Sequence, residues 1–225
     1  MIPLRSSERT TSPAITTLIL IAINVLVFFY ELNLQLTLPP YALNRFIAYY
    51  GIVPDRLHWS ALLTSMFVHG GFLHIAGNMW FLWIFGKGIE DLIGHVRFLV
   101  FYLLCGFAAG IVHIVVNAGS PVPTVGASGA IAGVMGAYLI KFPSARIVTL
   151  VPIFIFITTI DIPAAFLLLY WFVIQFFSGV GSVGYSQASS GDVAWFAHIG
   201  GFLAGMGFIL TMPTKPRFRQ WYSNV

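Results

Sequence analysis

The chain has 225 residues, of which 58% are hydrophobic and only 8% are charged, and its mean hydropathy is +0.89. Soluble globular domains carry about 25% charged residues, so this composition excludes a water-soluble domain and predicts a protein whose surface faces lipid. A bilayer is spanned by about 20 apolar residues, so the length allows about six spans joined by short connections. The formal net charge of +4 does not indicate nucleic-acid binding, because the basic residues form no single patch.

The apolar runs predict an all-α, six-helix bundle in one membrane domain. The expected spans are residues 15–32, 72–85, 98–116, 127–140, 162–177 and 193–212. Within the single domain 1–225, this gives a cytoplasmic tail over 1–12, a six-span core over 13–212 and a cytoplasmic tail over 213–225.

Three details of the connections are also predicted. Ser12 is expected to cap the first helix, with Pro13 at its first position. Residues 33–66 form a connection long enough to have structure of its own. The stretch before the fifth span is broken by Pro152 and is expected to be irregular or interfacial.

The distribution of basic residues predicts the orientation of the spans. With the N-terminus in the cytoplasm, the outer segments contain only Arg45 and Arg56. The inner segments then contain the other nine basic residues, Arg5, Arg9, Lys87, Arg97, Lys141, Arg146, Lys215, Arg217 and Arg219. The positive-inside rule therefore predicts that both termini are cytoplasmic, an N-in/C-in topology.

Polar side chains within apolar spans are costly, so each one requires a reason. The fourth span begins with the motif Gly126-Ala127-Ser128-Gly129. A helix from there to Lys141 is about 22 Å long, shorter than the ~30 Å hydrocarbon core, so Ser128 would lie below the outer surface. The segment before it must enter the membrane as irregular backbone, which is tolerated only inside protein or beside a water-filled cavity. Free N–H groups at such a helix start can bind an oxyanion.

His198 lies in the sixth span, on one helix face with Gly201 and Gly205. The fourth span has small-residue stripes of its own, namely Gly129/Gly133 and Ala132/Gly136. Small residues four apart allow membrane helices to approach closely. Contact between these two faces would bring Ser128 within hydrogen-bond distance of His198, and a serine nucleophile needs such a base to take its proton.

Each of these signals also has an ordinary structural explanation. Serine and glycine often serve only to pack membrane helices, and a single intramembrane histidine more often makes a structural hydrogen bond or lies on a proton path. His74 and Asn78 are four residues apart, share a helix face and could form a polar contact between helices. No His-Glu-x-x-His motif is present, which argues against a zinc protease.

In combination and in this order, the motifs resemble the rhomboid family of intramembrane serine proteases. The residues that carry the resemblance are His69, His74, Asn78, Glu90, Gly94, Arg97, Phe98, Tyr102, Gly126-Ala127-Ser128-Gly129, Ala197-His198, Gly201 and Gly205, within residues 49–212. The resemblance implies hydrolysis of peptide bonds in or near a substrate's transmembrane helix by a Ser–His dyad, with Ser128 as nucleophile and His198 as general base and acid. His74, Asn78 and the Ser128 backbone would stabilise the oxyanion. Gly126, Ala127 and Gly129 would line the site.

The resemblance carries further expectations. Residues 33–66 would form a membrane-embedded loop, and residues 178–192 a capping loop that moves with the fifth span. No cofactor and no metal is expected; the partners would be transmembrane protein substrates and the lipid bilayer, with no nucleic acid. The six-span form resembles prokaryotic members and predicts a plasma membrane, while the sequence leaves the oligomeric state open. Many relatives have an aromatic residue one turn after the serine, but this chain has Ala132, so another group must orient His198.

Three alternatives compete with the serine protease. An inactive relative that binds transmembrane helices would not need the complete set of Ser128, His198, His74 and Asn78. A transporter or proton channel would need polar residues spaced through the membrane, whereas these cluster toward one face. An aspartyl intramembrane protease would need two apposed aspartates, for which Asp161 and Asp192 are the candidates, and it is disfavoured because no Gly-x-Gly-Asp pattern is present.

Overall fold

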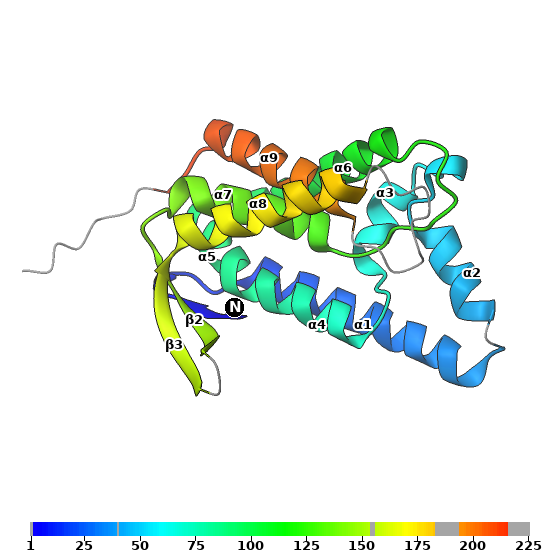
Figure 1. Ribbon diagram of the computed structural model, residues 1–225, viewed down its shortest axis with the longest axis horizontal. Coiled ribbons are helices and arrows are strands. Elements are labelled where there is room, and N and C mark those ends of the chain that lie inside the picture. The colour runs from blue at the N-terminus through cyan, green and yellow to red at the C-terminus, as the bar shows by residue number, and fades with distance from the viewer. Residues whose placement is uncertain (1, 40, 154–155, 183–193, 216–225) are drawn as a thin grey trace, which may run out of the picture.

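The computed structural model describes residues 2–39, 41–153, 156–182 and 194–215. They form a helical bundle with a small sheet at one end (Figure 1). The bundle helices are α1 (Ile15–Thr37), α4 (Phe72–Phe81), α5 (Lys87–Ile93), α6 (His95–Val116), α7 (Ser128–Lys141), α8 (Ala164–Ser182) and α9 (Trp195–Thr211). A π-helical turn, η3 (Leu82–Gly86), joins α4 to α5. Each expected span therefore coincides with a helical segment.

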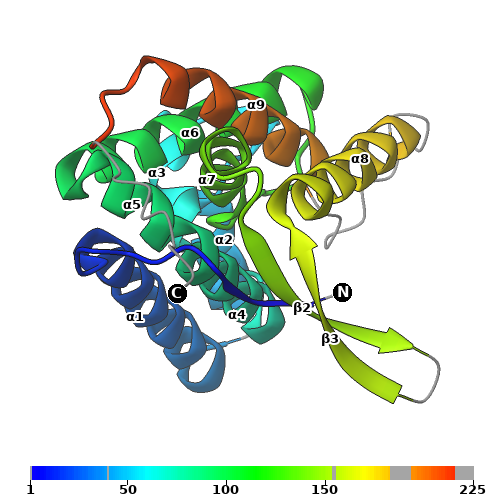
Figure 2. The ribbon, with the colours of Figure 1, turned by 90° about the vertical axis from the view of Figure 1, so that its left-hand side faces the viewer.

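Three of the helices within the described residues are long and apolar enough to cross a membrane. They are α1, α6 and α8, whereas α7 and α9 are apolar but shorter. The two shorter helices lie against each other, and α7 is enclosed by the rest of the bundle (Figure 2). Every residue of α7 from Gly129 to Leu139 is buried, so this helix is a core element surrounded by protein.

The contact between α7 and α9 depends on the glycines identified in the sequence. A β-carbon on Gly201 would collide with the carbonyl oxygen of Gly129, and one on Gly205 would collide with that of Gly133. A β-carbon on Gly136 would collide with the carbonyl oxygen of Phe202. The predicted close approach of the two helices is thus confirmed, and it is possible because these positions have no side chain.

Residues 33–66 have structure of their own, as predicted. The segment contains α2 (Tyr41–Tyr50), η1 (Pro54–Arg56) and α3 (Ala61–Thr64), followed by the turn η2 (Ser65–Phe67). It holds the irregular backbone that precedes α7. Ile52 and Thr124 exchange two backbone hydrogen bonds of 2.9 and 2.8 Å, and the carbonyl of Ser65 accepts the N–H of Gly126 at 2.8 Å. The backbone of Thr124 and Gly126 therefore has protein hydrogen-bond partners, which irregular backbone at membrane depth would need.

The expectation of an all-α fold is wrong in one region. Strands β1 (Ile2–Ser6), β2 (Arg146–Ile153) and β3 (Phe156–Pro163) form an antiparallel sheet in the order β1-β2-β3. Most residues of β2 and β3 are β-branched, which favours strands, and Pro152 lies beyond the part of β2 that pairs with β1. The N-terminal segment, for which no strand was predicted, supplies the edge strand β1.

The start of α1 also differs from the prediction. The helix begins at Ile15 rather than Pro13, and the hydroxyl of Ser12 bonds to Asp91 instead of capping the helix. The Glu90 carboxylate does the capping, because it accepts the N–H groups of Thr16 and Thr17 at 2.7 and 2.8 Å. A carboxylate at a helix N-terminus is favoured by the helix dipole.

The neighbouring Asp91 carboxylate has its own set of donors. It accepts the backbone N–H groups of Thr11 and Ser12 at 3.1 and 2.9 Å and both of their hydroxyls. Burial alone would raise the pKa of Asp91, but these hydrogen bonds outweigh it and lower the pKa to about 2. The N-terminal segment is thus fastened to α5 by an ionised carboxylate.

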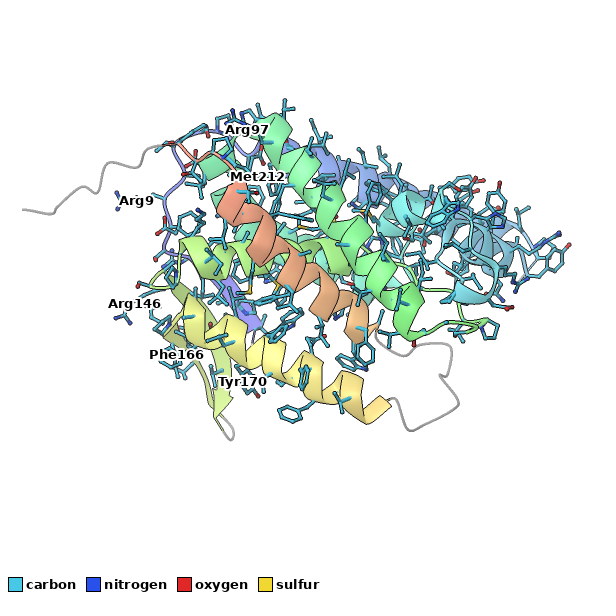
Figure 3. All side chains as sticks on the ribbon, turned by 90° about the horizontal axis from the view of Figure 1, so that it is seen from above. Arg9, Arg97, Arg146, Phe166, Tyr170 and Met212 are labelled. Carbon is cyan, nitrogen blue, oxygen red and sulfur yellow. The ribbon has the colours of Figure 1, made fainter. Side chains whose placement is uncertain are left out.

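Helix α8 lies at the edge of the bundle. Only 22% of the most apolar 18-residue segment of α8 is buried, against 39% of the corresponding segment of α6. Phe166 and Tyr170 of α8 are exposed (Figure 3). Its main aromatic contact with α9 is the stack of Phe172 on Phe202, with ring centroids 4.8 Å apart. On another side, an apolar cavity of about 280 Å³ lies between α8, α7 and α4–η3, with Pro3 of β1 in its wall. Helix α8 is therefore held mainly by α9.

Candidate active site

Ser128 and His198 are brought together by the α7–α9 contact. Ser128 is the first residue of α7, and His198 lies in the first turn of α9. The distance from Ser128 Oγ to His198 Nε2 is 2.7 Å, and His198 is only 8% exposed. The hydrogen bond expected from the glycine stripes is therefore present, and it places a basic nitrogen on a serine hydroxyl in a site largely closed to bulk water.

Helix α8 contacts the His198 ring on the side away from Ser128. His198 Nδ1 lies 2.5 Å from the Oε1 atom of Gln175, a buried residue. The Trp171 ring, one turn earlier on the same helix, packs against the imidazole with centroids 5.7 Å apart and planes inclined by 37°. The aromatic contact missing at Ala132 is thus supplied by a different helix.

His74 and Asn78 lie on the other side of the site, against Gly126. A β-carbon on Gly126 would lie 2.6 Å from His74 Nε2 and 3.6 Å from Asn78 Nδ2. The Gly70 N–H donates to His74 Nδ1 at 3.3 Å, so a neutral His74 carries its proton on Nε2, which faces Gly126. Asn78 Nδ2 is buried and has no hydrogen-bond partner among the described residues. Two N–H donors therefore converge beside the start of α7.

His69 has a different position from the other motif residues. Its backbone N–H donates to the buried Glu31 carboxylate of α1 at 3.1 Å, and its ring contacts that of His74 with centroids 5.2 Å apart. His69 therefore fixes the loop before α4 to α1 and packs against the His74 ring.

A small cavity of about 30 Å³ lies beside Ser128, enough for one or two water molecules. Gly126 and Gly129 line it, whereas Ala127 does not and is fully buried in the hydrophobic core. His113 also lines the cavity and its Nε2 lies 2.8 Å from the Thr124 hydroxyl, which helps to fix the segment before Ser128.

Sequence reasoning missed Gln175 and Trp171. Gln175 is the single amide side chain within the apolar residues 162–177, and this isolation was the available signal. The expected capping loop falls mostly on residues 183–193, outside the described residues, while residues 178–182 continue α8.

Residues 56–215 match the family model described as the rhomboid domain. The chain belongs to the rhomboid family. This rhomboid is 35% identical over 141 residues to the human "Presenilin-associated rhomboid-like protein, mitochondrial". The alignment covers 61% of this chain and 36% of the relative. The chain is 34% identical over 175 residues to "RHOMBOID-like protein 6, mitochondrial" of Arabidopsis thaliana, and the alignment covers 77% of this chain and 50% of the relative. It is 43% identical over 81 residues to "Rhomboid protease GluP" of Bacillus subtilis, and the alignment covers 36% of this chain and 15% of the relative.

This rhomboid spans half or less of the length of each of these relatives. Family membership and the apolar helices make it a multi-pass membrane protein. Two of the relatives are named as mitochondrial, which does not favour the expected prokaryotic plasma membrane, and one is bacterial.

Proposed function

We propose that this rhomboid is an intramembrane serine endopeptidase in which Ser128 is the nucleophile and His198 the general base. The observation that carries the proposal is the 2.7 Å hydrogen bond between Ser128 Oγ and His198 Nε2 in a buried site beside a small cavity. A serine is inert at its ordinary pKa and requires an adjacent base to attack a peptide carbonyl.

In the acylation half-reaction, Ser128 Oγ adds to the carbonyl carbon of the scissile peptide while its proton moves to His198 Nε2. The negative charge that develops on the carbonyl oxygen is stabilised by the backbone N–H of Ser128, His74 Nε2–H and Asn78 Nδ2–H. Donors of this kind act strongly in a low-dielectric site, because they need no reorganisation during the reaction. The C–N bond then breaks, and His198 transfers the proton to the departing amine.

In the deacylation half-reaction, a water molecule attacks the ester on Ser128. His198 takes a proton from this water, the ester C–O bond breaks, and Ser128 Oγ recovers its proton. The cavity lined by Gly126 and Gly129 provides space for that water beside the ester. His74 and Asn78 serve the second tetrahedral intermediate as they serve the first.

We further infer a six-span, N-in/C-in arrangement, with α4, α7 and α9 as the spans additional to α1, α6 and α8. Support comes from the basic side chains, since Arg9, Arg97 and Arg146 lie at the same end of the molecule (Figure 3). The substrates would be transmembrane proteins cleaved near the outer end of their helix, where Ser128 lies. We assign the enzyme to a plasma membrane of a prokaryote, with the mitochondrial names of two relatives as the competing possibility.

The test is labelling of the purified protein in detergent by a fluorophosphonate, in parallel with cleavage of a model transmembrane substrate. We expect wild type to label and cleave, and Ser128→Ala and His198→Ala to do neither. Cleavage by Ser128→Ala at the wild-type rate would overturn the assignment. A wild-type protein that neither labels nor cleaves would also overturn it and would leave helix binding without cleavage as the leading function.

A further inference from the structure

The side chain of Gln175 makes a buried contact that the Ser–His mechanism does not use. Its Oε1 atom lies 2.5 Å from His198 Nδ1, and Gln175 is only 6% exposed. A buried polar group in an apolar helix is costly unless it is hydrogen-bonded, and the contact with His198 satisfies the Gln175 carbonyl oxygen.

With Gln175 Oε1 as the atom that faces Nδ1, the contact indicates which ring nitrogen of His198 carries the proton. A carbonyl oxygen accepts hydrogen bonds and cannot donate them, so Oε1 requires a proton on His198 Nδ1. Neutral imidazole has one N–H, and Nε2 is then left with a free lone pair directed at the Ser128 hydroxyl. The opposite tautomer would put the proton on Nε2, where it could not receive one from serine.

From these contacts we propose that Gln175 is a positioning residue that completes a Ser128–His198–Gln175 relay. It selects the tautomer in which His198 is a base, and together with Trp171 it fixes the ring plane. The inference rests on the proposed protease function. A neutral amide does this without the added charge of an aspartate, so it orients the imidazole but stabilises the imidazolium less than a carboxylate would.

The relay ties the chemistry to the position of α8. Trp171 and Gln175 are one turn apart on α8 and both contact His198 of α9, and Gly179, one turn later, lies close to Trp195 and Ile199. Since α8 is the exposed helix at the edge of the bundle, His198 is correctly oriented only while α8 is packed on α9.

The test compares Gln175→Met, Gln175→Glu and Val173→Ala in the purified protein. Methionine fills a similar volume without an amide acceptor, so kcat should fall by about 10- to 100-fold with little change in KM. Glutamate offers an acceptor oxygen in either protonation state, so Gln175→Glu should keep kcat within a few-fold of wild type. Val173 is exposed on the same helix, and its replacement should change nothing.

The tautomer gives a readout that a purely structural role would not alter. In 15N-histidine spectra, wild type and Gln175→Glu should show His198 protonated at Nδ1, and Gln175→Met should show a mixture of the two tautomers. Wild-type kcat in Gln175→Met, or an unchanged tautomer, would overturn the relay. If wild type cleaves while Ser128→Ala does not, such a result refutes the role of Gln175 and leaves the protease function intact.

Discussion

Gly126 and His74 are packed so closely that a β-carbon on Gly126 would lie 2.6 Å from His74 Nε2. Gly126 also has a φ of +123°, a backbone conformation that other residues rarely adopt. The glycine in front of Ala127 therefore has two functions. It lets the chain turn into α7, and it leaves space for two side-chain donors beside Ser128.

We predict that Gly126→Ala lowers kcat by about 10²-fold or more, because the methyl group displaces one oxyanion donor. The measurement is kcat and KM for a transmembrane substrate, alongside the Tm in detergent. Gly119→Ala is the matched control. Gly119 has a φ of +81° and open space in the described part of the chain, so it introduces backbone strain without touching the site. Equal losses of kcat in both variants would contradict this explanation.

The Asn78 Nδ2 atom, which has no partner among the described residues, gives a second prediction. Asn78→Ala should reduce kcat by about 10²- to 10³-fold while KM changes little, because the lost donor acts on charge that develops only in the transition state. The control is Asn24→Ala. Asn24 is also a buried asparagine, but its Nδ2 donates to the Leu20 carbonyl of its own helix at 2.7 Å, away from the site. If Asn78→Ala retained wild-type kcat, Asn78 would not be an oxyanion donor.

The contact between α7 and α9 can be tested at Gly205. A β-carbon there would collide with the backbone of Gly133, and backbone cannot move as a flexible side chain can. Gly205→Ala should therefore destabilise the fold by about 1–3 kcal/mol or more, seen as a lower unfolding midpoint. Gly207→Ala on the same helix is the control. No described residue lies within 4 Å of a β-carbon there, so its midpoint should stay unchanged or rise.

Most of the site could be predicted from the sequence because its residues interact through patterns local to one helix. The pairs Gly201/Gly205 and Gly129/Gly133 share helix faces, and faces of small residues find each other in a membrane. The motif Gly126-Ala127-Ser128-Gly129 marked the start of a helix, and Ser128 is the first residue of α7. Such patterns can be read from the spacing of residues along the chain, and the structure brings these glycine pairs of α7 and α9 into contact.

The remaining features depend on contacts that no single segment contains. Gln175 reaches His198 only because α8 packs beside α9, and no periodicity within α8 indicates which neighbour it meets. The β1 strand forms because Ile2–Ser6 finds an edge of β2 far along the chain, a pairing that depends on tertiary structure rather than local propensity. Ser12 has the residue type of a cap, but its hydroxyl bonds to Asp91. The charged carboxylate of Glu90, from a distant part of the chain, accepts the N–H groups of Thr16 and Thr17 at the start of the helix.

The carboxylate of Asp91 predicts how stability depends on pH. Its pKa in the folded protein is about 2, below the ordinary value of 3.8. The ionised form is therefore favoured by folding, and its contribution is fully present above about pH 4 and is lost as the pH falls toward 2. We expect Asp91→Asn to lose about 1–2 kcal/mol of stability at pH 7. The difference in unfolding midpoint between this variant and wild type should shrink below pH 4 and disappear near pH 2.

The appropriate control is Asp55→Asn, because Asp55 is an exposed aspartate in the short helix η1. Its unfolding midpoint should equal that of wild type, because the Asp55 side chain is exposed and its replacement removes no buried hydrogen bond. The decisive quantity is the difference between Asp91→Asn and wild type, since Glu90 titrates in both proteins and its effect cancels. A difference that stays constant from pH 7 to pH 2 would mean that Asp91 holds the N-terminal segment through its shape and not through its charge.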